Sequence, residues 1–283
     1  EVNNVILDTD DSMTLYAAGY DAGNNYIGDQ ISAVWTLTGD LDPPGGGGAS
    51  FTFNPSTAPT SGSIVATIGS ISNATGTITV NPGDLNALIV RNAPNNGGNA
   101  VDALNLTTDD TYTFYAAGYD SEGNYRSEEV VSWTSTIGLS GSGTSITFDP
   151  DSPISGTLTA TSGSISDATG MITVSTGSLD HLIIRDAADG SGNEVNSVTM
   201  DTDDSRTFYA AGYDADNNFI ADQSSAIWTL TGDLDPPGGS GANFTFNPST
   251  SPSSTSDVAT DCSVSDVTGP ITVNPGSLNS LII

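Results

Sequence analysis

The sequence predicts an all-β chain built as three tandem β-sandwiches, placed end to end. Short segments alternate apolar and polar residues at every second position, and 32 glycines and 14 prolines punctuate them. Both features are typical of strands separated by tight turns. A repeat is also visible, because the stretch Ala17–Asp21 recurs at 116–120 and 210–214. A repeat of about 100 residues fits one β-sandwich per copy.

The strands of a sandwich can be read in order from the first repeat. Along Leu15–Tyr20, successive side chains should point to opposite faces of a sheet. Ala33–Leu37 carries a tryptophan at its centre, and Phe51–Phe53 and Ile78–Val80 alternate in the same way. Turn residues lie between these segments, as in Asp-Ala-Gly-Asn, Asp-Pro-Pro-Gly and Asn-Pro-Gly. One tryptophan per repeat is therefore expected in each core: Trp35, Trp133 and Trp228.

The chain resembles the bacterial immunoglobulin-like modules found in tandem in invasin-type adhesins and other secreted surface proteins. The resemblance rests on the pattern Leu-Tyr-Ala-Ala-Gly-Tyr-Asp-x-x-x-Asn, on one tryptophan per repeat and on a closing Gly-x-Ile-Thr-Val segment. It covers nearly the whole chain, three times. It implies an immunoglobulin-like fold for each repeat and a location outside the cell or on its surface. Such modules act as spacers, adhesive tips and carbohydrate-binding accessories, so the resemblance implies no single function.

Charge and composition exclude several classes of partner and activity. The chain has 34 acidic residues against four arginines and no lysine, for a formal net charge of −30. Nucleic acid and anionic membrane surfaces are excluded as partners, because both require cationic side chains, and no apolar run is long enough to insert into a membrane. With one histidine and one cysteine the chain offers no nucleophile–base pair, and we expect no enzyme. Glu1 is no initiator methionine and no signal-like stretch follows it, so we expect a mature chain or a fragment.

The boundaries of the repeats predict modules over residues 1–82, 83–176 and 177–275, followed by an orphan strand over 276–283. Modules two and three each open with an apolar strand, at Leu85–Val90 and Leu179–Ile184. The first module starts at a position that aligns with Glu194, so it lacks this opening strand. The segment Leu278–Ile283 has the sequence of an opening strand with no module after it.

These two features predict that the terminal segment of one chain completes the first module of the next. Strand addition of this kind is a head-to-tail contact, which extends into filaments rather than closed rings. The alternative is a longer tandem polypeptide in which the next module follows covalently. The residues expected at the contact are Leu278, Leu281, Ile282, Ile283, Val2 and Val5.

Acidic clusters recur with the repeat, and strand parity brings them to the joints between modules. Carboxylate oxygens suit Ca²⁺, which takes six to eight oxygen ligands, so structural Ca²⁺ at the joints is one interpretation. The other is that these aspartates form turns without metal. The candidate ligands are Asp10, Asp11, Asp40, Asp42, Asp109, Asp110, Asp120, Asp203, Asp204 and Asp214.

The sequence thus predicts an extracellular structural protein whose partners are copies of itself, joined head to tail into a filament. Within the same class, the stalk of a large adhesin is the alternative. A carbohydrate-binding accessory module is the alternative from another class, and it depends on the tyrosine rows. These tyrosines would either bind glycans or be covered by a loop or an edge strand: Tyr16, Tyr20, Tyr115, Tyr119, Tyr209 and Tyr213.

Overall fold

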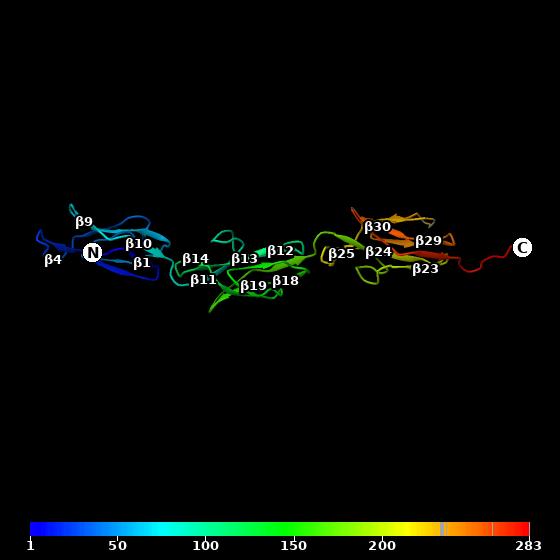
Figure 1. Ribbon diagram of the computed structural model, residues 1–283, viewed down its shortest axis with the longest axis horizontal. Coiled ribbons are helices and arrows are strands. Elements are labelled where there is room, and N and C mark those ends of the chain that lie inside the picture. The colour runs from blue at the N-terminus through cyan, green and yellow to red at the C-terminus, as the bar shows by residue number, and fades with distance from the viewer. Residues whose placement is uncertain (233–234, 236, 262, 283) are drawn as a thin grey trace. The chain divides into compact units, whose positions relative to one another are not determined.

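The computed structural model describes residues 1–232, 235, 237–261 and 263–282, and its regular elements over this part of the chain are all β-strands (Figure 1). The all-β prediction is therefore confirmed. The predicted contact residue Ile283 lies outside the described residues, as does the single cysteine, Cys262. The described residues contain no helix with the length and apolar character needed to cross a membrane.

The chain forms two compact units. The first consists of Glu1–Leu104, Tyr112–Phe148 and Gly156–Ile172, and the second of Asn105–Thr111, Asp149–Ser155 and Thr173–Ile283. The division passes through the second sequence repeat, so that the contacts between repeats one and two fall within the first unit. The contacts between repeats two and three fall within the second.

The first repeat contributes ten strands in four small sheets. β1 lies parallel to β10, whose other edge pairs with β7; β2 pairs with β6, β3 with β4, and β8 lies between β5 and β9. The bounds are β1 Val5–Asp8, β2 Met13–Tyr16, β3 Ala18–Tyr20, β4 Tyr26–Asp29, β5 Val34–Leu37, β6 Ser50–Phe53, β7 Thr60–Gly62, β8 Ile64–Ile68, β9 Ile71–Ala74 and β10 Ile78–Asn81.

The second repeat contributes eleven strands. β13 lies between β11 and β14 and also pairs with β17, β21 lies between β12 and β18, and the third sheet has the order β16-β15-β19-β20. The bounds are β11 Ala87–Arg91, β12 Leu104–Thr107, β13 Tyr112–Tyr119, β14 Tyr125–Glu128, β15 Val131–Ser135, β16 Gly141–Gly143, β17 Ser145–Phe148, β18 Ile154–Gly156, β19 Leu158–Ser162, β20 Ile165–Ala168 and β21 Ile172–Ser175.

The third repeat has the same arrangement as the second. Its sheets are β22-β24-β25 with β28 also paired to β24, β23-β32-β29, and β27-β26-β30-β31. The bounds are β22 His181–Arg185, β23 Val198–Asp201, β24 Arg206–Tyr213, β25 Phe219–Asp222, β26 Ile227–Leu230, β27 Gly239–Ser240, β28 Asn243–Phe246, β29 Ser253–Thr255, β30 Asp257–Asp261, β31 Val264–Val267 and β32 Ile271–Asn274.

Each repeat buries its tryptophan, as the sequence predicts. Trp35, Trp133 and Trp228 are almost fully buried. Their indole N–H groups donate to the carbonyls of Gly48, Gly143 and Gly241, at 2.9, 3.1 and 2.8 Å. The buried indole N–H thus has its partner in every repeat, which burial of a tryptophan requires.

The opening strands differ in extent from the prediction. β11 and β22 begin two residues later than expected and extend through Arg91 and Arg185. Gly83 and Gly177, four residues before these strands, lie at the joints. Their backbone N–H groups donate to threonine hydroxyls of the preceding repeat.

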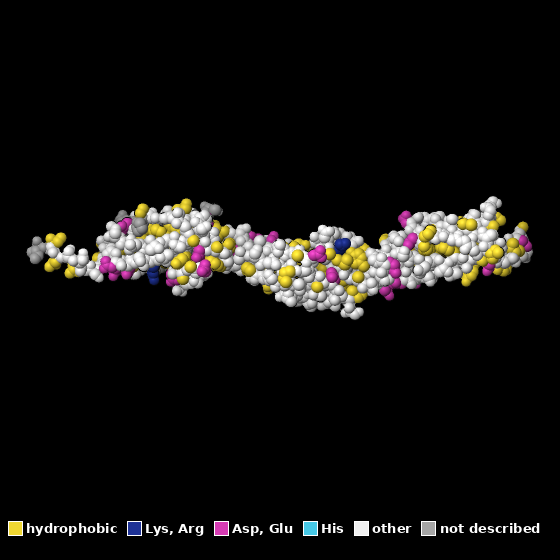
Figure 2. Space-filling model, turned by 180° about the vertical axis from the view of Figure 1, so that it is seen from behind, with side chains coloured by type: hydrophobic (Ala, Val, Ile, Leu, Met, Phe, Trp, Pro, Cys, Tyr) yellow, Lys and Arg dark blue, Asp and Glu magenta, His cyan; other side chains and the backbone are white. Residues whose placement is uncertain are grey.

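The terminal segment forms no strand over its described residues, 275–282, and leaves the second unit as coil (Figure 1). Apolar side chains stand free along it in Figure 2. A strand is held by hydrogen bonds to a neighbouring strand, and no strand within the described part of the chain pairs with this segment. The segment expected to be an orphan strand therefore has the sequence of an opening strand, but its described residues are coil in the single chain.

Candidate assembly site

Opening strands in the second and third repeats fill the gap between two other strands. β11 pairs with β13 in antiparallel register, from Ala87 opposite Tyr119 to Arg91 opposite Tyr115. Its other side packs against β20, where the backbone N–H of Val90 donates to Asp167 at 2.7 Å. β22 occupies the same place in the third repeat, between β24 and β31. There the N–H of Ile184 donates to Asp266, also at 2.7 Å.

The equivalent place in the first repeat holds no strand, and we call it the socket: the place beside β3 and β9, which correspond to β13 and β20. No strand among the described residues pairs with the outer edge of β3. Tyr20 is 60% exposed, whereas its equivalents Tyr119 and Tyr213 are 9% and 6% exposed. Ala18 is exposed, whereas the equivalent alanines of β13 and β24 are fully buried. The missing strand therefore accounts for the exposed surface.

The lack of a pairing strand also changes the backbone of the first repeat. The eight-residue strands β13 and β24 are continuous, but the matching stretch of the first repeat is interrupted at Ala17 and forms β2 and β3. On the opposite wall of the socket, Ile71 is 77% exposed, whereas its equivalents Ile165 and Val264 are half-buried. Asn73 stands there, at the position of the acceptors Asp167 and Asp266.

The residues predicted for the contact fall into two groups. Leu278, Leu281 and Ile282 are 85%, 81% and 94% exposed in the terminal segment. Val2 and Val5 do not lie on the β3 edge: Val2 packs against the first core and borders a depression shared with Asn73, and Val5 belongs to β1. Sequence reasoning missed the side chains that form the socket walls, Ala18, Tyr20, Ile71 and Asn73. The signal was available, because their equivalents in the other repeats face the opening strands.

The joint between repeats one and two is held by a cluster of hydrogen bonds that we call the joint latch. The Thr9 hydroxyl donates to Asp120 Oδ2 at 2.7 Å, and the Gly83 N–H donates to both Thr9 Oγ1 and Asp120 Oδ2, at 2.8 and 3.1 Å. The Asp84 N–H donates to Asp10. The Asn124 amide extends the latch to the first repeat, donating to the Ser56 carbonyl at 3.1 Å. Thr9 and Asp120 are both buried.

The joint between repeats two and three has the same latch. The Thr108 hydroxyl donates to Asp214 Oδ2 at 2.7 Å, and Gly177 N–H donates to Thr108 Oγ1 and Asp214 at 2.8 and 3.0 Å. The Ser178 N–H donates to Asp109 at 2.7 Å, and Asn218 donates to the Asp151 carbonyl at 2.9 Å. The same hydrogen bonds therefore connect neighbouring repeats at both joints, and the segment between them is not a flexible linker.

The electrostatics of the latch favour ionised aspartates. Burial raises the pKa of Asp120, but hydrogen bonds from Asn124, Thr9 and Gly83 outweigh burial and bring the pKa below its ordinary value. The pKa of Asp214 is lowered by the equivalent set of donors against the same cost of burial. Hydrogen bonds to a carboxylate stabilise the charged form.

The remaining acidic candidates mostly accept local hydrogen bonds. Asp11, Asp110 and Asp204 each accept a backbone N–H three residues earlier in the chain, and Asp42 accepts from Ser56 and Thr57. Asp203 accepts the N–H of Ser277 at 2.6 Å. Asp40 accepts no hydrogen bond with its carboxylate, and its backbone N–H donates to the Ser61 carbonyl.

The ten candidates do not assemble a recognisable metal centre. Among the described residues, no group of three or more acidic, histidine or cysteine side chains comes together in a way that could hold a metal ion. Ca²⁺ at the joints stays a prediction from sequence, and the carboxylates there have hydrogen-bond donors as partners.

Chelation of divalent ions is expected to leave the thermal midpoint of the chain unchanged, because the latch carboxylates are already satisfied by N–H and O–H donors. Calorimetry with and without EGTA measures this. A midpoint that falls in EGTA and recovers on addition of Ca²⁺ would contradict the hydrogen-bonded latch and restore the metal interpretation.

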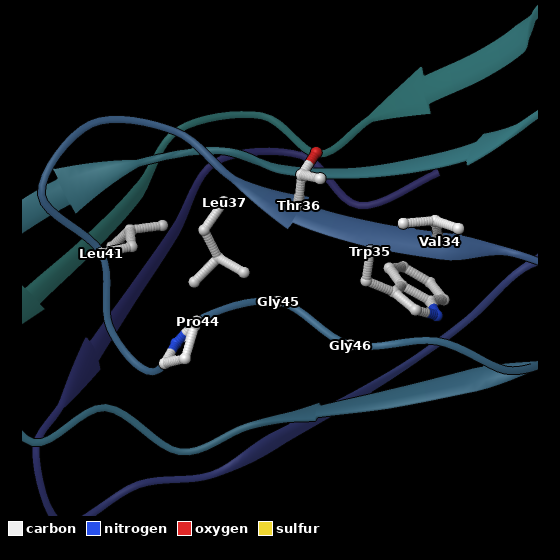
Figure 3. A pocket seen from close by; sticks show the side chains of 8 residues that line it. All are labelled: Val34, Trp35, Thr36, Leu37, Leu41, Pro44, Gly45 and Gly46. Carbon is white, nitrogen blue, oxygen red and sulfur yellow. The ribbon is translucent and has the colours of Figure 1, made fainter.

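A shallow depression also lies beside β5 (Figure 3). Trp35 and Leu37 point from β5 toward Gly45 and Gly46, while Thr36 points to the opposite side of the strand. No charged side chain lines the depression, and the indole N–H is already bonded to a carbonyl. Of the tyrosines that suggested a sugar site in repeats two and three, Tyr119 and Tyr213 are buried and accept hydrogen bonds from Arg91 and Arg185. Tyr115 and Tyr209 are half-buried.

No family model and no curated protein matches this chain. Among solved structures, the surface layer protein SbsC (domains 1–6) matches at 14% identity and a TM-score of 0.32, over 94% of this chain and 38% of that one. The extracellular cadherin domains 1–4 of protocadherin gamma B7 match at 11% identity and a TM-score of 0.44, over 98% of this chain and 75% of that one. Immunoglobulin domains 1–4 of Sidekick-1 match at 7% identity and a TM-score of 0.33, over 97% of this chain and 72% of that one. All three are arrays of tandem domains, and at these TM-scores they assign neither a family nor a function.

Proposed function

We propose that this chain is an extracellular structural protein whose copies join head to tail into a filament, with segment 278–283 of one copy added as a strand in the socket of the next. The observation that carries the proposal is the filling of the same place in repeats two and three by β11 and β22. The location outside the cell rests on the resemblance to secreted surface modules. The role is mechanical, and no catalytic group is assigned to the chain.

The terminal segment matches the opening strands residue by residue. Leu278-Asn279-Ser280-Leu281-Ile282-Ile283 aligns with Leu85-Asn86-Ala87-Leu88-Ile89-Val90. Leu88 lies opposite Gly118 and is buried, as Leu182 is in the third repeat. The same register in the socket places Leu281 opposite Gly19 and Ile282 opposite the exposed Ala18.

Strand addition removes two costs at once. It buries apolar side chains that are now almost fully exposed, at about 1.5–3 kcal/mol for each large side chain, and it satisfies the free backbone groups along β3. The formal charge of −30 keeps separate filaments apart in solution by mutual repulsion.

Substitution of Leu281 by aspartate is expected to abolish assembly, because the charge would enter the position that Leu88 and Leu182 bury. Light scattering and electron microscopy of purified chains measure filament length. The matched control is Ile6→Asp, an exposed apolar residue of β1 outside the socket, which should assemble as the unchanged chain does. Equal assembly of Leu281→Asp and unchanged chains would refute the proposal.

A substitution in the socket tests the other half of the same contact. Ala18→Glu should leave the isolated chain folded because Ala18 is exposed, and its longer side chain should occupy the place of the added strand beside β3. Chains with only Ala18→Glu and chains with only Leu281→Asp should each stay monomeric, and their mixture should form dimers and nothing longer. The denatured mass of native filaments then separates strand exchange from a covalent stalk: exchange requires a species near 28.7 kDa, and a far longer polypeptide supports the stalk.

A further inference from the structure

The end of the third repeat has the same donor groups as the latches of the two joints, but the aspartate that accepts them there is missing. Gly276 N–H donates to Thr202 Oγ1 at 2.9 Å, as Gly83 and Gly177 do to their threonines. Ser277 N–H donates to Asp203 at 2.6 Å. The Thr202 hydroxyl has no acceptor among the described residues, and Thr202 is half-buried where Thr9 and Thr108 are buried.

The missing partner exists on the first repeat, as a turn over residues 21–25 that is already in its latch conformation. Asp21 Oδ1 accepts the N–H of Gly23 and of Asn25 at 2.8 and 2.9 Å. Asp120 and Asp214 accept the same two N–H groups of their turns. Asn24 has the positive φ of 63° that Gly123 and Asn217 adopt at this point, at 87° and 65°.

Asp21 differs from its two equivalents only in what approaches from outside the turn. Asp120 and Asp214 are buried beneath a threonine hydroxyl of the preceding repeat and the glycine N–H at the start of their own repeat, whereas Asp21 is exposed. Its Oδ2 accepts only from the side chain of its own Asn25, at 3.1 Å. The Asp21 carboxylate is thus already held in the latch orientation by its own turn. Its Oδ2 is accessible to donors from outside the turn, as a third latch requires.

We propose that the Asp21–Asn25 turn of one copy is the receiving half of a copy-to-copy latch, whose donors are Thr202 and Gly276 of the preceding copy. This inference rests on the proposed head-to-tail function and adds a polar contact to the apolar strand. Asn25 donates to the Ser249 carbonyl of the preceding copy, as Asn124 donates to the carbonyl of Ser56. The partner chemistry is therefore a second copy of this chain, recognised by one hydroxyl and two backbone groups.

The latch gives the assembly direction and angle, which an added strand alone would fix less well. Leu281 and its neighbours bind one edge of the first repeat, and the latch binds the turn at the end of that edge. Charge-assisted hydrogen bonds of this kind are short and directional. Two contacts far apart in sequence thus fix one geometry of the joint.

The experiment uses the two blocked chains as a pair. Only one interface can form between them, and it contains both the added strand and the latch. The first chain carries Ala18→Glu and a free terminal segment; the second carries Leu281→Asp and a free socket. Calorimetry gives the dissociation constant of the pair. Asp21→Ala in the second chain should weaken the pair about 10- to 100-fold, because it removes a buried charged acceptor. The charge-matched control, Asp102→Ala in the same chain, is an exposed aspartate of repeat two and should leave the constant unchanged.

A double-mutant cycle identifies the partner. Thr202→Val in the first chain should weaken the pair, and it should cost much less when Asp21→Ala is already present in the second. A pair that forms with the unchanged affinity in the Asp21→Ala and Thr202→Val variants would overturn the latch and leave the strand proposal standing. Failure of the two blocked chains to pair at all would overturn both.

Discussion

Replacement of Asp257 by leucine is expected to raise the free energy of unfolding of the third repeat by about 4 kcal/mol at pH 8. Asp257 opens β30 and is 0% exposed, and among the described residues neither of its carboxylate oxygens has a hydrogen-bond partner. The equivalent positions are Ile64 and Leu158, which are buried in their cores. Burial raises the pKa of Asp257 to about 7. A shift of that size from an ordinary 3.8 costs about 1.4 kcal/mol per unit once the group is charged.

The pH dependence follows from the direction of this shift. The folded repeat keeps its proton up to a pH near 7, whereas the unfolded chain loses it near pH 4, so the unfolded state gains stability between these values. The contribution of Asp257 to stability should therefore fall as the pH rises from 4 to 7 and stay constant above. The leucine variant should lose this slope.

Hydrogen exchange read by mass spectrometry on fragments of β26 and β30 measures the effect in the intact chain. Asp257→Asn is the control for charge, since it cannot titrate but keeps a polar group in the core. It should flatten the pH profile with a smaller gain in protection. The same decline between pH 4 and 7 in the leucine variant would show that another group is responsible.

Loss of Asp214 should open the joint between repeats two and three, with a cost of about 3 kcal/mol to the docking of these repeats. Asp214→Ala leaves the Thr108 hydroxyl and the Gly177 N–H without their acceptor in a buried place. Exchange of the Gly177 and Ser178 amides should become faster by about two orders of magnitude. Asp216→Ala is the matched control, because Asp216 is an exposed aspartate of the same turn. Equal exchange in the two variants would show that the carboxylate does not hold the joint.

Acid should have the same effect as this substitution. Hydrogen bonds keep the pKa of Asp214 below its ordinary value despite burial. The stabilisation is complete above the unfolded pKa, near 4, and is lost as the pH falls below it. Asp257 and Asp214 therefore act in opposite directions, and the third repeat with its joint should be most stable close to pH 4.

The sequence predicted the features that depend on local pattern. Period-two alternation located several strands of the first repeat and the opening strands of the other two, and the recurrence of a tryptophan located each core. Strand parity brought Asp10 and Asp120 to one joint, and Thr9, which binds Asp120 there, was not predicted. Their chemistry could not be read from the pattern, because a carboxylate that binds metal and one that accepts a hydroxyl have the same sequence signature. Asp257 was missed because a single aspartate at an apolar position of a strand reads as a turn residue until its burial is known.

The direction in which the last strand of a repeat pairs has a mechanical consequence. β23 and β32 run parallel, with four consecutive residue pairs from Val198 opposite Ile271 to Asp201 opposite Asn274, and β1 and β10 pair likewise in the first repeat. Traction on the start of one strand and the end of its parallel partner slides one strand along the other, so the hydrogen bonds of the pair must rupture together instead of unzipping one by one. Such a pair would therefore resist a force directed along its strands more strongly than a force directed across them.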